Sequence, residues 1–116
     1  MSARIKVLPV SRRRAQVFAA LGDEKRLGLV ARLSDGQPLS ISRLAENSGL
    51  TRQGLTRHLR TLEAAGLVSN RRIGRESVFE LRPEPVHDLQ TYLKKVSDQW
   101  DDALNRLKSL VERNPV

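Results

Sequence analysis

The chain contains no cysteine, and this absence excludes several chemistries at once. Disulfides, thiolate metal ligands and cysteine nucleophiles all need a sulfur atom that the sequence does not supply. Aromatic residues make up only 3% of the 116 positions, so leucine, valine and alanine must fill the core of a single compact domain. The sequence also lacks an apolar run long enough to cross a membrane or to form a secretory signal. We therefore expect a cytoplasmic protein.

Positive charge is in excess, and its position along the chain is more informative than its total. The sequence carries 21 lysines and arginines against 13 aspartates and glutamates. Residues 1–14 have five basic side chains and no acidic one, and residues 40–82 have eight arginines against four glutamates. Residues 83–116 are nearly balanced, with five basic and six acidic side chains. A polyanionic partner is therefore predicted to meet the middle of the chain rather than its last third.

Turn and cap residues divide the first half of the chain into short helices. We expect a flexible basic arm over residues 1–11, followed by a helix that ends at Gly22 and a second helix capped by Asp23. Two further helices follow, with Ser40 and Thr51 as their N-caps and a sharp reversal at Gly49 between them. The second of these carries an apolar stripe at helical spacing, formed by Leu55, Leu59 and Leu62. A helix, a tight turn and a helix are the parts of a DNA-reading helix-turn-helix.

The face of this last helix opposite the leucine stripe is polar and basic. At 100° per residue it carries Gln53, Arg57 and Arg60 at its centre, with Arg52 and Thr56 at its edges. Arginine and glutamine present paired polar groups that match base edges in the major groove, and the helix N-terminus at Thr51 favours a phosphate. An ordinary solvated helix face usually mixes charges of both signs, whereas none of these five residues is acidic.

A β-hairpin is predicted next, with strands over residues 68–73 and 77–81 and a turn at Gly74-Arg75. Arg71, Arg72 and Arg75 make its tip basic and suited to the DNA backbone or the minor groove. The alternative is a charged edge strand that discourages aggregation.

His58 also has two interpretations, as a donor to a DNA phosphate or as a half-buried histidine bonded within the motif. The predicted DNA-binding residues are Thr51, Arg52, Gln53, Thr56, Arg57, His58, Arg60, Arg72 and Arg75.

A long helix with a narrow apolar seam is predicted over residues 83–113. Apolar residues recur from Val86 to Leu110 at intervals of 3-4-3-4-3-4-3, which is the spacing of a coiled coil. The seam favours dimerisation, although a helix packed within one chain could show the same stripe. Leu104 and Val111 widen it on one side, which predicts an additional contact with the body of the chain. The predicted dimer-interface residues are Phe18, Leu89, Leu93, Val96, Trp100, Ala103, Leu107 and Leu110.

Four segments carry a resemblance to a known family: FAALGDEKRL at 18–27, LA at 44–45, TRQGLTRHL at 51–59 and LEAAGLV at 62–68. Over residues 12–112 the chain resembles the ArsR/SmtB family of bacterial regulators. The resemblance implies a homodimer that is joined by its first and last helices, reads a palindromic operator and usually represses transcription. It also implies a mainly α fold with a small β-hairpin wing: a winged helix-turn-helix over residues 12–82, flanked by N- and C-terminal dimerisation helices.

Many members of that family sense metals, and this sequence departs from them at the ligand positions. Ser40 and Ser42 stand where the resemblance implies two cysteines, and hydroxyls do not replace thiolates for soft metals. Pro85 stands where it implies an aspartate. The remaining ligand-like residues are His87, Asp98 and Asp101, which could hold a hard ion but are more typical of a solvated helix edge. We therefore predict no metal site and no cofactor.

Other classes of function have less support. An enzyme would need a constellation that two isolated histidines and no glycine-rich phosphate loop do not provide. A protein-interaction module built on the coiled-coil helix alone would leave the arginine-rich face unexplained. Single-stranded RNA binding would need aromatic surface on which bases stack. The residues therefore predict a sequence-specific protein that binds double-stranded DNA, and the resemblance implies a homodimeric repressor whose effector the sequence does not identify.

Overall fold

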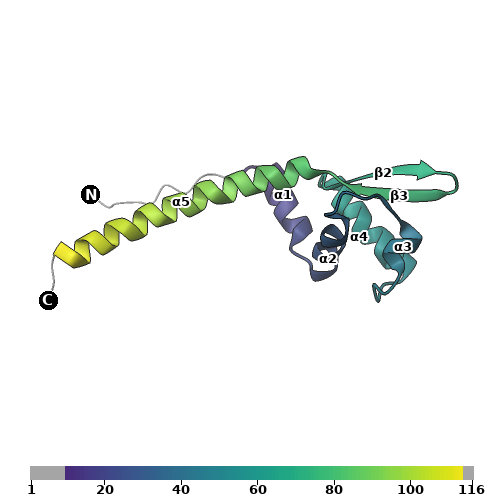
Figure 1. Cartoon of the computed structure of the whole chain (residues 1–116), viewed down its shortest axis with the longest axis horizontal. Helices are drawn as coiled ribbons and strands as arrows, with labels where there is room; N and C mark the ends of the chain where they lie inside the picture. The colour runs from purple at the N-terminus through teal and green to yellow at the C-terminus, as the bar shows by residue number, and fades with distance from the viewer. Residues whose placement is uncertain (1–9, 114–116) are drawn as a thin grey trace.

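The computed structural model describes residues 10–113. The elements are α1 Arg12–Leu21, α2 Glu24–Leu33, β1 Leu39–Ser40, α3 Ile41–Ala45, α4 Arg52–Ala64, β2 Val68–Ile73, β3 Glu76–Leu81 and α5 Pro83–Arg113. The predicted arm over residues 1–11 lies outside this part of the chain except for Val10 and Ser11. Figure 1 shows the short helices and the small sheet gathered at one end, with α5 extending away from them. The fold is therefore mainly α with a β-hairpin wing, as the sequence predicts.

Local side-chain caps explain where the short helices begin. Ser11, Ser40 and Thr51 each accept a hydrogen bond from the backbone N–H three residues further on. Asp23 accepts from two backbone N–H groups at the start of α2. These oxygens satisfy donors that the first turn of a helix leaves unpaired. The caps predicted at Asp23, Ser40 and Thr51 are confirmed, and Ser11 is one more.

The core is a cluster of leucines inside the helix-turn-helix. The three predicted stripe residues of α4, Leu55, Leu59 and Leu62, are all 0% exposed. They pack in one cluster with Val17 and Phe79, which come from α1 and β3. Burial of this stripe presses one side of α4 against the body and leaves the opposite side in solvent.

The sheet has three strands in the order β1-β3-β2, whereas the sequence predicts only the hairpin. Leu39 and Ser40 pair with Phe79 and Val78 along the free edge of β3. A two-residue strand has no alternation that a sequence pattern could detect, because it forms only where an existing edge offers backbone partners. The hairpin itself follows the prediction, with Ile73 opposite Glu76 across a two-residue turn in which Gly74 has a φ of 64°.

Only the beginning of α5 packs on the rest of the chain. Leu89 and Tyr92 are 5% and 6% exposed, and the Tyr92 ring meets Phe18 of α1 edge-on with 6.2 Å between centroids. The predicted contact of Leu104 and Val111 with the body is wrong, because these residues are 58% and 63% exposed. The reason is length. At 1.5 Å per residue α1 spans about 15 Å and α5 about 46 Å, so no other helix or strand between residues 10 and 113 lies beside most of α5 (Figure 1).

An ion pair joins α1 to α5, although the two helices are far apart in the sequence. Arg14 donates from Nε and Nη2 to the carboxylate oxygens of Asp88 at 2.9 and 3.0 Å, and its guanidinium lies 5.0 Å from the centre of the Tyr92 ring. The hydrogen bond from Arg14 lowers the pKa of Asp88, and the charge of Arg14 adds to this effect. The same hydrogen bond raises the pKa of Arg14.

The lowered pKa of Asp88 predicts an acid-sensitive contact. A carboxylate with a folded pKa below its unfolded value stabilises the fold above the unfolded value, and this contribution disappears as the pH falls through the folded value. We therefore expect Asp88→Asn to lower the melting temperature slightly at about pH 7 and not at about pH 2. Thermal unfolding followed by circular dichroism measures this, with Asp98→Asn on the exposed part of α5 as the matched control. An equal loss at both pH values would contradict the prediction.

Candidate nucleic-acid interface

The exposed side of α4 is the most distinctive surface of the structure. Gln53, Arg57 and Arg60 are exposed together, opposite the buried leucines. Arg52 is exposed at the edge, and Thr56 is half-buried with its hydroxyl donating to the Arg52 carbonyl at 2.8 Å. A shallow hollow runs along this face from Arg52 to Ala64, and no acidic side chain lines it.

The N-terminus of α4 adds a positive dipole end to this face. Thr51 Oγ1 accepts from the Gly54 N–H at 3.0 Å, and the first turn contains no acidic residue. A Cβ atom at Gly54 would lie 3.1 Å from that oxygen, so a side chain there would crowd the cap. The first turn of a helix leaves N–H groups without intrahelical partners, so the positive end of this 13-residue helix favours an anion.

The turn between α3 and α4 sets the angle at which α4 stands. Asn47 and Gly49 have φ values of 57° and 72°, which is the left-handed region that permits a sharp reversal. Ser48 Oγ donates to the Ala45 carbonyl at 2.9 Å and accepts from the Leu50 N–H at 3.1 Å. Arg32 of α2, which the sequence analysis did not single out, donates to the carbonyls of Arg43 and Leu44 at 3.1 Å each and so closes the end of α3.

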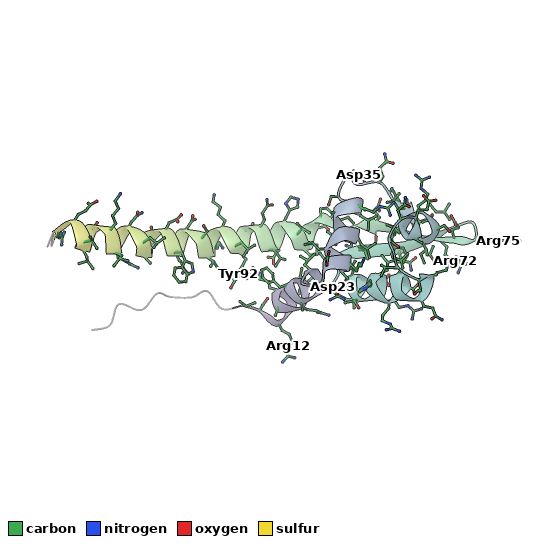
Figure 2. All side chains as sticks on the ribbon, turned by 90° about the horizontal axis from the view of Figure 1, so that it is seen from below. Arg12, Asp23, Asp35, Arg72, Arg75 and Tyr92 are labelled. Carbon is green, nitrogen blue, oxygen red and sulfur yellow. The ribbon has the colours of Figure 1, made fainter. Side chains whose placement is uncertain are left out.

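The wing places more positive charge at the same end of the molecule. Arg71, Arg72 and Arg75 are exposed, and Arg72 Nη2 donates to the Arg75 carbonyl at 3.3 Å across the turn. Figure 2 shows the labelled Arg72 and Arg75 at the tip farthest from the free end of α5. Ser42 Oγ of α3 donates a hydrogen bond to Glu76 Oε1 at 3.0 Å, which connects the start of β3 to the helix-turn-helix.

No carboxylate neutralises the arginines of these two elements within the described residues. Only two ion pairs form between residues 10 and 113, Arg14–Asp88 and Arg26–Asp23, and both lie outside α4 and the wing. Cations without protein counter-ions on an exposed face remain available to phosphates and base edges. The structure therefore brings the predicted DNA-binding residues of α4 and the wing to one end of the molecule.

His58 lies apart from this face. It is half-buried, about 140° around α4 from Gln53, and its Nδ1 lies 3.3 Å from Nη1 of Arg26. This contact is the one expected of a histidine bonded within the motif. A DNA contact by His58 stays a prediction.

The predicted dimer residues divide into two groups. Phe18 and Leu89 pack within the chain, while Leu93, Trp100, Leu107 and Leu110 are between 51% and 57% exposed. Val96 and Ala103 are partly exposed on the same seam. Sequence reasoning missed Tyr92, because it falls one position before the 3-4 repeat, although its spacing of three residues from Leu89 places the two on one helix face.

The ligand-like residues His87, Asp98 and Asp101 are all exposed on α5. His87 and Asp98 are 11 residues apart, about 16 Å along a helix, so one protomer cannot bring them to one ion. Between residues 10 and 113 no group of three or more histidine, aspartate or glutamate side chains could hold a metal ion. In the same part of the chain, no helix combines the length and the apolar character that crossing a membrane requires.

A helix-turn-helix with an unneutralised basic face on α4, followed by a basic β-hairpin, defines a winged helix-turn-helix DNA-binding protein.

Comparison with known proteins agrees with this class. The family described as "Helix-turn-helix domain" matches residues 21–71. The HTH-type transcriptional regulator Rv2034 of Mycobacterium tuberculosis is 32% identical over 97 residues, which cover 84% of this chain and 87% of that protein. The arsenic resistance transcriptional regulator ArsR1 of Pseudomonas putida is 31% identical over 102 residues, with coverages of 84% and 79%.

Solved structures show the same relationship. An ArsR-like transcriptional regulator from Rhodococcus sp. RHA1 superposes with a TM-score of 0.77 at 32% identity, covering 88% of this chain and 93% of that one. The homodimeric winged helix-turn-helix DNA-binding domain of Mb0332 from Mycobacterium bovis gives a TM-score of 0.60 at 25% identity, with coverages of 78% and 83%. The chain belongs to the ArsR family of winged helix-turn-helix transcriptional regulators, and it is a DNA-binding regulator of transcription.

Proposed function

We propose that this regulator is a homodimeric repressor that binds an inverted-repeat operator and acts by binding, without catalysis. The observation that carries the proposal is the separation of two surfaces in one elongated molecule of 70 × 26 × 22 Å. Unneutralised arginines of α4 and the wing gather at one end, and an exposed apolar seam extends toward the other (Figure 2). A two-fold dimer built on the seam would present two reading helices to two half-sites.

The seam supports the dimer because its burial needs a second helix. Leu93, Trp100, Leu107 and Leu110 recur at coiled-coil spacing, and each is more than half exposed in the single chain. A contiguous apolar stripe of this kind marks an interaction site. A second copy satisfies it with the same residues on both sides, and the Mycobacterium bovis structure is of a homodimer. We therefore propose residues 83–113 as a dimerisation helix, supported by α1, and residues 12–82 as the DNA-binding unit.

We divide the DNA contacts into reading and positioning contacts. Gln53 and Arg57 at the centre of the exposed face of α4 read base edges, with Arg52, Thr56 and Arg60 around them. Thr51 and the N-terminus of α4 meet a phosphate, while Arg72 and Arg75 hold the duplex backbone beside the groove. Because the partner is chromosomal DNA, we place the protein in the cytoplasm.

In vitro selection from a random double-stranded DNA library tests this function. We expect enrichment of an inverted repeat whose half-sites lie about one helical turn, roughly 10 base pairs, apart. The recovered duplex, placed in a promoter, should reduce transcription in a purified system as protein is added. Single-stranded RNA should compete poorly. Enrichment of no sequence would leave the coiled-coil interaction module as the function, and a rise in transcription would identify an activator.

We also predict that divalent metal does not control DNA binding. The serines at positions 40 and 42 and Pro85 cannot supply the missing ligands, and the carboxylates of Asp98 and Asp101 stand where a zinc site prefers nitrogen or sulfur. Affinity for the selected duplex should agree within error in a chelator and in excess zinc, nickel or cobalt, and Trp100 fluorescence should not titrate. A stoichiometric metal that changes this affinity about tenfold, and that His87→Ala abolishes, would overturn the prediction.

A further inference from the structure

One side chain outside the DNA-facing surface joins three elements of the fold. The guanidinium of Arg26, on the first turn of α2, donates from Nε to the Ala20 carbonyl at 2.7 Å and from Nη2 to the Ala19 carbonyl at 3.4 Å. The Ala20 carbonyl lies in the last turn of α1, where the helix supplies no partner for it, while the Ala19 carbonyl also accepts from the Gly22 N–H at 3.2 Å. The third nitrogen, Nη1, lies 3.3 Å from Nδ1 of His58 on α4. Arg26 therefore connects the end of α1 to the recognition helix.

The contact with His58 favours one tautomer of that imidazole. Arginine has five N–H donors and no acceptor, so the Nδ1 atom of His58 must be the acceptor. An accepting Nδ1 carries a lone pair, so the contact is formed by the tautomer with its ring proton on Nε2. The arrangement is partly shielded from solvent, because the Arg26 side chain is only 19% exposed. Asp23 lies 4.0 Å from Arg26, and the hydrogen bond from the Arg26 backbone N–H lowers the pKa of this aspartate.

A second polar contact attaches α1 to α4. Gln16 of α1 donates to the Ala64 carbonyl at the C-terminal end of α4 at 3.4 Å. Arg26 holds α4 six residues earlier, about 9 Å away along the axis. The buried leucines press α4 onto the body, and a directional bond on each side of that contact limits rotation of the helix about its own axis.

We propose that Arg26 is a positioning residue for DNA recognition, which sets the rotation of α4 through His58 and thereby aims Gln53 and Arg57 at base edges. The inference rests on the proposed function of α4. The same side chain links the reading surface to the dimer seam, because α1 also holds α5 through Arg14–Asp88 and Phe18–Tyr92.

Affinity for the selected duplex tests the coupling. We expect Arg26→Ala and His58→Leu each to weaken binding about threefold to tenfold, and the double variant to be little weaker than either, because both remove one shared interaction. His58→Asn should bind more tightly than His58→Leu, since an asparagine Oδ1 sits near the position of Nδ1 and can accept from Arg26. Lys25→Ala, which removes a neighbouring exposed charge from α2, is the matched control and should change little.

A spectroscopic measurement on the free protein separates positioning from general stability. The sequence contains only two histidines, so nitrogen NMR of the imidazoles compares His58 with the exposed His87 in one sample. We expect His58 in the Nε2–H form in the wild type and in Lys25→Ala, and a mixture of tautomers in Arg26→Ala. Arg26→Lys, which keeps the charge but not the fork of donors, should behave like Arg26→Ala.

Each outcome has a distinct meaning. Circular dichroism and sedimentation confirm that a variant is folded and dimeric before its affinity is compared, and the His58 variants carry the test if Arg26→Ala does not fold. If the double variant loses as much affinity as the two single variants together, the positioning role is wrong. An unchanged His58 tautomer in Arg26→Ala would also overturn it. If the wild type itself does not prefer the selected duplex, the proposed function fails instead.

Discussion

Replacing Leu93 and Leu107 with aspartate should turn the proposed dimer into monomers. Both leucines lie on the seam of α5, are 51% and 57% exposed in one chain, and would be buried against a second copy. A carboxylate in that position must lose its hydration or separate the helices. Because a monomer engages one half-site instead of two, we also expect affinity for the selected inverted repeat to fall at least about a hundredfold.

Sedimentation velocity at micromolar concentration measures the oligomeric state directly. The matched control is Thr91→Asp with Asn105→Asp, which adds the same two charges on the side of α5 away from the two leucines, about 160° around the helix. This control should stay dimeric and bind normally. A dimeric Leu93→Asp, Leu107→Asp variant would show that another surface joins the subunits.

Variants of α4 and of the wing should weaken DNA binding in two different ways. We expect Gln53→Ala or Arg57→Ala to cost about 1–3 kcal/mol on the selected duplex and to relax its sequence preference, as loss of a base contact does. Arg72→Ala or Arg75→Ala should weaken all duplexes alike and reduce the salt dependence by about one phosphate contact per arginine. The difference follows from their positions, on the exposed face of α4 and on the exposed wing tip (Figure 2).

Titrations of the selected duplex and of a scrambled duplex at several salt concentrations separate the two effects. Arg113→Ala at the far end of α5 removes one positive charge without touching either element, so it controls for net charge. Equal loss of sequence preference in the α4 and wing variants would contradict the division between reading and positioning.

Much of the interface was predictable because its determinants are local. The caps at Asp23, Ser40 and Thr51 act within one helical turn. A glycine at position 74 likewise permits the two-residue turn that reverses the chain between β2 and β3. The outward direction of Gln53, Arg57 and Arg60 follows from the leucine stripe on the other side of the same helix. These features need only residues a few positions apart.

Other features had no local signal. Leu39 and Ser40 are a strand only because β3 leaves an edge beside them. The contacts of Arg26 with His58, and of Arg14 with Asp88, join residues 32 and 74 positions apart. Leu104 and Val111 are exposed because α5 extends away from the other elements before it reaches them. Helical periodicity does not show where a helix leaves the rest of the fold.

The sequence by itself determined the elements and the chemistry of their faces, because hydrophobic period, caps and turn residues act over a few positions and a helix converts spacing into direction. Only the tertiary structure decided which faces remain free. Burial of a side chain depends on what the rest of the chain brings against it. Packing therefore left the arginines of α4 and the wing without carboxylate partners, directed His58 toward Arg26, and left most of the α5 seam exposed.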